Sequence, residues 1–362
     1  MKTKILTVLI VAIIAICISP AIVDADTAQD HVDDNWYYVV SDANDFSIVN
    51  QNCIFVVEDV SITDTTFYNN LNTAVNNQNL IISYDGADLF ESELYERSTA
   101  FVVGADATAT YVDPITGTVY CHSVVCSDSA KTKELMRDWS TAIMNSQETQ
   151  IVTTSNSDIE WGHEIQSSAD IVCEDYGMMN INTNYVEQVT DSPYNRYFKT
   201  YYEVQSVPNE ARRTADINIL CDVGCRPGQE LRSYGPTTTS STSTASVSLN
   251  WGVSTSGPSV SASTGWSYSI PDVSIVDESD YSEDIFSIKH DVDEGKNVGK
   301  NTYKVNPGLI ASTDKTQNDG SYHVTDVYSI QFAKWLKGFW PWSPEYAQEY
   351  SWFEYSMDVN IE

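Results

Sequence analysis

The stretch ASVSLNWGVSTSGPSVSASTGWSYSI, residues 245–270, decides the fold. Apolar residues occupy every second position from Ala245 to Val253. After a break at 255–258, apolar residues and one Thr recur at every second position from Val260. A period of two is typical of a strand with one apolar face. Two such runs on either side of a Gly-Pro break predict a β-hairpin.

The same alternation predicts the register of this hairpin. If residues 255–258 form the loop, the apolar faces of the two strands coincide. A shift by one residue would turn one apolar face to the wrong side. The expected pairs are Val253–Val260, Trp251–Ala262, Leu249–Thr264, Val247–Trp266 and Ala245–Tyr268.

The hairpin carries no charge. No Lys, Arg, Asp or Glu lies between Arg232 and Asp272, although the chain holds 51 acidic and 19 basic residues. Strands of about 9–11 residues with one apolar and one small polar face are typical of transmembrane β-barrels. The alternative is a hairpin of a soluble sandwich, with one face in the core and one in water. The residues that would insert into a membrane are Val247, Leu249, Trp251, Val253, Val260, Ala262, Trp266 and Tyr268.

The start of the chain predicts export. Lys2 and Lys4 precede an apolar run at 5–18, and small residues at 23–25 offer a cleavage site. This is the pattern of a signal peptide, so residues 1–25 predict a secreted, extracellular protein. The formal net charge of −32 argues against nucleic acid and against anionic membranes as partners.

Six cysteines follow the predicted signal peptide. An even number in an exported chain predicts disulfides, and the close pairs at 121/126 and 221/225 could close small loops. Neither pair has the spacing of a zinc site, so no metal site is predicted from them. The six candidates are Cys53, Cys121, Cys126, Cys173, Cys221 and Cys225.

The rest of the chain predicts an α+β protein. Strand patterns alternate with helix patterns over residues 26–150, which favours a small α/β domain. Residues 151–170 are polar and mixed, as in a linker. Residues 171–362 are dominated by strand patterns and predict an antiparallel β-sandwich that contains the stem-like amphipathic hairpin 245–270.

No pattern indicates an enzyme. The chain lacks the GxGxxG, P-loop and GxSxG motifs, and its five His residues are scattered. Acidic loops near Asp280 and Asp293 leave room for a weak Ca²⁺ site, although a solvated loop is the simpler interpretation in so acidic a chain. No other cofactor is expected.

Residues 334–353, KWLKGFWPWSPEYAQEYSWF, are unusually aromatic. Pro341 and Pro344 prevent a regular strand through Trp342. Such a loop packs as a small core, lies at a membrane interface, or binds a sugar or choline group. The residues predicted to make these contacts are Trp335, Trp340 and Trp342.

The segment GWSYSIPDVSIVDESDYSEDIFSIKHDV, residues 265–292, resembles the part that follows the stem in the leukocidin and hemolysin family of β-barrel pore-forming toxins. The resemblance extends to the Trp-rich segment and the last strand, within residues 170–362. It implies a soluble monomer that oligomerises on a membrane, inserts hairpin 245–270, and contacts lipid or glycan headgroups.

Two features depart from that family. The region between Asp291 and Tyr322 is shorter than the family's headgroup-binding rim, and the N-terminal α/β domain is not part of the usual toxin. The sequence therefore leaves a second hypothesis open: a non-lytic secreted or cell-surface protein that binds glycan or another ligand through residues 334–353.

Overall fold

The computed structural model describes residues 37–361. Within that range it leaves out the segments 41–52, 59–64, 77–78, 85–97, 147–160, 189–191, 193, 211, 254–259, 293–301, 318–319 and 338–344.

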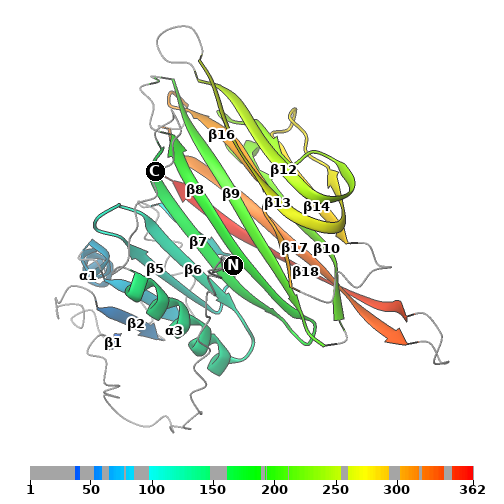
Figure 1. The fold of residues 1–362 in the computed structure, drawn as a ribbon. Coiled ribbons are helices and arrows are strands. Elements are labelled where there is room, and N and C mark those ends of the chain that lie inside the picture. The colour runs from blue at the N-terminus through cyan, green and yellow to red at the C-terminus, as the bar shows by residue number, and fades with distance from the viewer. Residues whose placement is uncertain are drawn as a thin grey trace, which may run out of the picture. The chain divides into compact units, whose positions relative to one another are not determined.

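The described chain is mostly β-strand, arranged as two packed sheets (Figure 1). The large sheet has the order β1 (Tyr37–Val40), β2 (Ile54–Glu58), β3 (Leu80–Tyr84), β5 (Ala107–Val112), β6 (Val119–Val125), β7 (Trp161–Cys173), β8 (Gly177–Gln188), β9 (Asn195–Pro208), β16 (Gly308–Asp314) and β11 (Gln229–Gly235), with β15 (Tyr303–Val305) also paired to β9. The small sheet has the order β12 (Thr239–Val253), β13 (Val260–Asp277), β14 (Ile285–Val292), β10 (Arg212–Asp222), β17 (Tyr322–Lys337), β18 (Glu345–Ile361) and β4 (Thr99–Val102).

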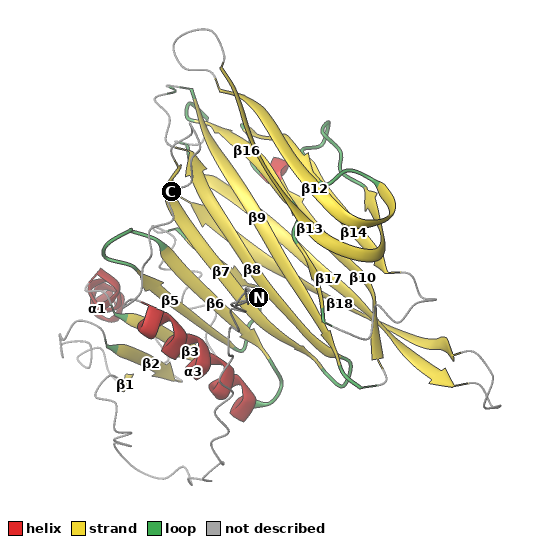
Figure 2. Cartoon of the chain, in the orientation of Figure 1, coloured by secondary structure: helices red, strands yellow, loops and turns green. Residues whose placement is uncertain are grey.

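Two helices cover the N-terminal part of the large sheet on opposite faces (Figure 2). In α1 (Thr65–Asn76), the apolar residues Phe67, Leu71, Ala74 and Val75 lie in the same buried core as Phe55 of β2. In α3 (Ser129–Ser146), Met136 lies in the second buried core together with Ile54, the neighbour of Phe55 that points to the other face. No helix in the described part of the chain is long and apolar enough to cross a membrane.

The large sheet runs without a break from the N-terminal strands into the sandwich. β6 pairs in parallel with β7, from Val119↔Ile165 to Val125↔Ile171. Residues 161–170, which we predicted as part of a linker, therefore form most of a central strand. The apolar alternation of this strand is weak in the sequence, because its buried positions include Ser167. The Ser167 hydroxyl donates to the Ala100 carbonyl of β4 at 2.9 Å.

The prediction of disulfides is wrong, because all six cysteines are free thiols. Cys121 lies in the core between the sheets, whereas Cys126 lies in the core under α3, on the other side of the large sheet. Cys221 is buried in β10, and Cys225 is exposed in the short 3₁₀ helix that follows. Burial raises the pKa of Cys121 to about 12, which disfavours its reactive thiolate.

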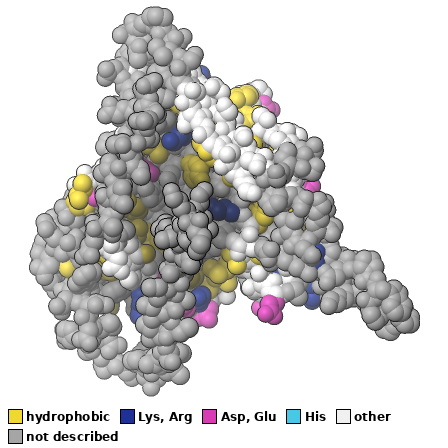
Figure 3. All heavy atoms as spheres, in the orientation of Figure 1, with side chains coloured by type: hydrophobic (Ala, Val, Ile, Leu, Met, Phe, Trp, Pro, Cys, Tyr) yellow, Lys and Arg dark blue, Asp and Glu magenta, His cyan; other side chains and the backbone are white. Residues whose placement is uncertain are grey.

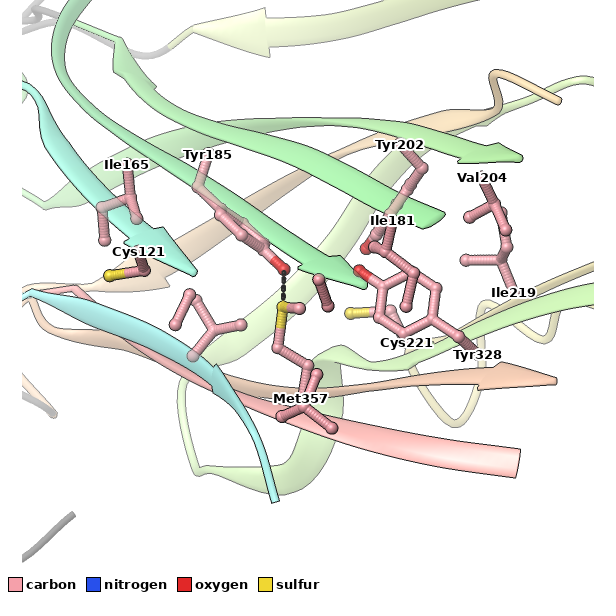
Figure 4. Packing of buried hydrophobic residues seen from close by; sticks show 14 of the residues in the cluster. Cys121, Ile165, Ile181, Tyr185, Tyr202, Val204, Ile219, Cys221, Tyr328 and Met357 are labelled. Atoms are coloured by element: carbon pink, nitrogen blue, oxygen red, sulfur yellow. Dashed lines mark hydrogen bonds between the residues drawn. The ribbon is translucent and has the colours of Figure 1, made fainter. Parts of the chain in front are cut away.

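The core between the sheets contains a buried carboxyl, that of Asp326 on β17. Its oxygens accept hydrogen bonds from the hydroxyls of Tyr185 and Tyr202, the latter at 2.9 Å, and from Tyr328 at 3.3 Å. Figure 4 shows these three tyrosines, from both sheets, around Cys221 and Met357. Burial raises the pKa of Asp326, and the hydrogen bonds from Cys221 and the tyrosines offset part of that rise.

Candidate functional site

The β12–β13 hairpin has the register that the sequence predicted. Two register shifts, between Thr239 and Thr244, separate the hairpin from the rest of the small sheet. Beyond them, the paired residues are Ala245↔Tyr268, Val247↔Trp266, Leu249↔Thr264, Trp251↔Ala262 and Val253↔Val260.

The two faces of the hairpin differ sharply in exposure and polarity. The apolar face is buried at Ala245, Val247, Leu249, Trp251 and Tyr268, and partly buried at Trp266. The side chains of Val253, Val260 and Ala262 lie outside the described atoms. Figure 3 draws the surface over the hairpin mostly in white, the colour of uncharged polar side chains and backbone. The exposed positions are Ser246, Ser248, Asn250, Gly252, Ser263, Gly265, Ser267 and Ser269.

Strands of the large sheet cover the apolar face closely. A Cβ atom on Gly235 of β11 would lie 3.2 Å from Val247 Cγ1. A Cβ atom on Gly308 of β16 would lie 2.5 Å from Trp266 Cη2, so the indole ring rests directly on the glycine backbone. The apolar face therefore belongs to the core of the sandwich in this state.

Polar side chains fix the hairpin at several points along its length. The Trp251 indole donates to Gln188 Oε1 at 3.1 Å, and the Trp266 indole donates to the Asn306 carbonyl at 2.8 Å. The backbone N–H of Asn250 donates to Ser233 Oγ at 2.9 Å. Each such bond contributes about 0.5–1.5 kcal/mol, so the covered state is held by modest interactions in addition to apolar burial.

The buried end of the hairpin rests on a histidine. The Tyr268 hydroxyl lies 2.7 Å from His290 Nε2 on β14, and His290 has no exposed surface. Burial lowers the pKa of His290 to about 3, so its ring is neutral near pH 7. Our sequence analysis missed this residue. The signal was its place in the apolar alternation of Phe286, Ile288 and Val292.

Substitution of Gly308 tests how the hairpin is packed. Gly308→Ala would place a methyl group 2.5 Å from Trp266 and 2.7 Å from the Thr200 carbonyl. We expect the free energy of unfolding to fall by about 1–3 kcal/mol, as for other overpacked cores. The matched control is Gly252→Ala on the exposed face, where a Cβ atom meets nothing within 4 Å. Urea unfolding measures both, and equal effects would contradict the packing described here.

The structure does not describe the side chains of the three tryptophans that we predicted to contact a membrane or a ligand. Trp335 belongs to β17, but its side chain lies outside the described atoms, as do Trp340 and Trp342 entirely. The same segment does expose two large rings, since 45% of Tyr350 and 47% of Trp352 is accessible to solvent.

The acidic loop at 277–284 is closed by its own hydrogen bonds. The Asp280 carboxylate accepts from the Ser282 N–H at 2.8 Å and from its hydroxyl at 2.7 Å. Among the residues that the structure describes, no group of three His, Cys, Asp or Glu is placed to hold a metal ion. Asp293 of the other predicted Ca²⁺ loop lies outside the described residues.

Comparison with family models and with curated proteins finds no match. Among solved structures, the chain is similar to one titled "Pore forming protein", at 11% identity over 58% of this chain and 95% of that chain, with a TM-score of 0.36. It is also similar to the delta-toxin of Clostridium perfringens, at 10% identity over 59% and 96% of the two chains, with a TM-score of 0.37. A third is the NetB toxin of Clostridium perfringens in the membrane inserted form, at 11% identity over 54% and 96%, with a TM-score of 0.28.

Proposed function

We propose that this protein is a secreted pore-forming protein that oligomerises on a membrane and inserts hairpin 245–270 into a shared β-barrel. The observation that carries the proposal is the hairpin itself. It has one apolar face stored against the large sheet, one uncharged polar face in water, and no charged side chain from 245 to 270.

The dimensions of the hairpin fit the task. The paired segments 245–253 and 260–268 each supply nine residues. A tilted strand of about 9–11 residues crosses the hydrocarbon core of a bilayer. The absence of charge matters, because an Arg or Lys on the lipid face costs about 2–4 kcal/mol at the bilayer midplane.

One hairpin cannot enter lipid alone. Its two outer edges would bring unpaired backbone N–H and C=O groups into hydrocarbon, where each costs several kcal/mol. Hairpins from several copies of the chain can pair edge to edge and close into a barrel, which satisfies every backbone group. The apolar face would then exchange the cover of β11 and β16 for lipid, and the Ser face would line water.

Aromatic side chains would bring the monomer to the membrane. In this proposal the segment 334–353 contacts lipid or glycan headgroups through Trp335, Trp340 and Trp342, and the exposed rings of Tyr350 and Trp352 in the same segment add to this contact. Tyr and Trp favour the membrane interface because one part of the ring is buried while the polar edge stays wet. The net charge of −32 favours zwitterionic over anionic lipid.

Neighbouring probes on β13 test insertion. Ser263 is exposed on the polar face, and Thr264 pairs with Leu249 on the apolar face. We would label Ser263→Cys and Thr264→Cys with a polarity-sensitive dye, in a Cys225→Ser background that removes the exposed native thiol. The labelled proteins are added to zwitterionic vesicles that hold a second, encapsulated dye, whose release reports pore formation. Under conditions of release, the label at 264 should report lipid and the label at 263 should report water.

Dye release without this alternation would contradict insertion of the hairpin. Vesicle binding without any dye release, across lipid and glycolipid compositions, would favour the non-lytic binding protein instead.

A further inference from the structure

We propose that the contact between Tyr268 and His290 is an acid-sensitive latch, which holds the hairpin against the sandwich at neutral pH and opens on acidification. The inference rests on the proposed function, because it concerns how release of the same hairpin is controlled.

The latch lies at the base of the stored hairpin. Tyr268 pairs with Ala245, the first buried residue of the apolar face. Its hydroxyl lies 2.7 Å from His290 Nε2, and the two ring centroids are 6.0 Å apart. The backbone of His290 pairs with Ile275 of β13 and Ile217 of β10, so the histidine stays in the sheet when the hairpin leaves. Release of Tyr268 therefore removes the hydrogen-bond partner of His290 and one of the rings packed against it.

Among the described residues, the groups beside His290 are the phenol of Tyr268 and the aliphatic residues Ile217 and Ile275, which pair with it in the sheet. Tyr268 of β13 is its hydrogen-bond partner, and Tyr303 of β15 and Tyr201 of β9 lie near enough to Tyr268 to interact with it electrostatically. On its own strand, Lys289 and Asp291 alternate with His290 and point to the opposite face. On β10, Asp216 forms an ion pair with Lys289 at 3.3 Å on that same opposite face.

A neutral ring suits this site, whereas a protonated ring does not. Either neutral tautomer can share a hydrogen bond with a hydroxyl, which both donates and accepts. No carboxylate in the described part of the chain acts on His290, so a protonated ring would be a fully buried charge without a described counterion. Burial accordingly lowers the pKa of His290 to about 3, and the backbone of Ile217 offsets this only in part.

The sign of the pH dependence follows from linkage. After release, an exposed histidine regains a pKa of about 6.5, so the released state binds the proton more tightly. The stored state is therefore favoured above about pH 6.5 and loses that advantage as the pH falls. With pKa values of about 3 and about 6.5, the ratio of released to stored hairpin rises roughly 25-fold between pH 7 and pH 5.

Amide hydrogen exchange of the full chain in solution, without membrane, measures this ratio. Corrected for the intrinsic effect of pH on exchange, protection of 245–253 and 260–268 should fall by roughly 25-fold from pH 7 to pH 5. His290→Gln keeps a polar partner that does not titrate, and it should remove this fall. Tyr268→Phe should lower hairpin protection at pH 7 by roughly fivefold, because one hydrogen bond is lost.

His122→Gln is the matched control. His122 is also buried with a pKa lowered to about 3, but it lies on β6 against Trp139 of α3, in the other part of the molecule. It should leave the pH response of the hairpin unchanged. The same fall in wild type and His290→Gln, or a fall that is shared equally by β8 and β9, would overturn the latch.

Dye release from zwitterionic vesicles separates the latch from the proposed function. Faster release at pH 5 than at pH 7 in wild type, with no such difference in His290→Gln, is expected. Equal release at both pH values would overturn the latch while leaving pore formation in place. A hairpin that opens in acid without dye release at either pH would contradict pore formation and support the latch.

Discussion

Asp326→Ala should lower the free energy of unfolding by about 3–5 kcal/mol, because it removes the acceptor at the centre of a buried polar cluster. The hydroxyls of Tyr185, Tyr202 and Tyr328 all donate to this carboxyl, and none of these side chains reaches solvent. Loss of the carboxyl removes the acceptor of Tyr185 and Tyr202, whereas the Tyr328 hydroxyl keeps Thr183 Oγ1 at 2.8 Å, and it leaves a cavity between the two sheets.

The matched control for this change is Asp358→Ala. Asp358 lies on the neighbouring strand β18, is exposed, and accepts a hydrogen bond from the Thr325 hydroxyl at 2.9 Å. Its loss should cost at most about 0.5 kcal/mol, as for an ordinary surface position. Asp326→Asn, which keeps the volume and one carbonyl acceptor, should fall between the two variants. Denaturant unfolding followed by tyrosine and tryptophan fluorescence measures all three, and a silent Asp326→Ala would contradict the cluster.

The sequence was sufficient to predict the hairpin and its register. Apolar residues alternate over both strands, and the Gly-Pro break fixes the loop, so only one register joins the apolar faces. The helix α3 also begins at a local signal, because the carboxylate of Asp128 accepts a hydrogen bond from the Ala130 N–H at 2.9 Å at its start. Both signals involve residues that are close together in the sequence, so they can be recognised without knowledge of the rest of the fold.

The sequence did not predict how the N-terminal strands join the sandwich. Pairing of β6 with β7 joins residues more than forty positions apart, and that of β4 with β18 joins residues more than 250 apart. Neither strand pair has a short turn that would announce it. β7 also carries Ser167 at a buried position, which weakened the apolar period on which the prediction of a strand depends.

The alternation of residues along two strands points to two polar residues of the core. Asp326 occupies the same face of its strand as Tyr322, Val324, Tyr328 and Ile330, which are all fully buried. His290 likewise lies on the same face of β14 as the buried residues Phe286, Ile288 and Val292. A titratable residue on the apolar side of a strand is worth singling out, because burial there requires a partner. The partners themselves come from other strands, and no pattern along the chain names them.

A reversible disulfide between β11 and β12 should abolish pore formation. A Cβ atom on Gly235 would lie 3.3 Å from Val247 Cα, so the two backbones are in direct contact and we expect cysteines at both positions to form a disulfide. The bond would tie the hairpin to the large sheet near the middle of β12. The double variant replaces only Val247 on the apolar face of the hairpin, because Gly235 lies outside residues 245–270.

The most direct test of the account is dye release by Gly235→Cys/Val247→Cys in the Cys225→Ser background, before and after oxidation. The oxidised protein should release no more dye than vesicles without protein, and a reductant should restore release to the level of the reduced protein. Each single-cysteine variant should release dye equally under both conditions. Undiminished release by the oxidised double variant would show that pores form without departure of the hairpin from the sandwich, and would contradict the account.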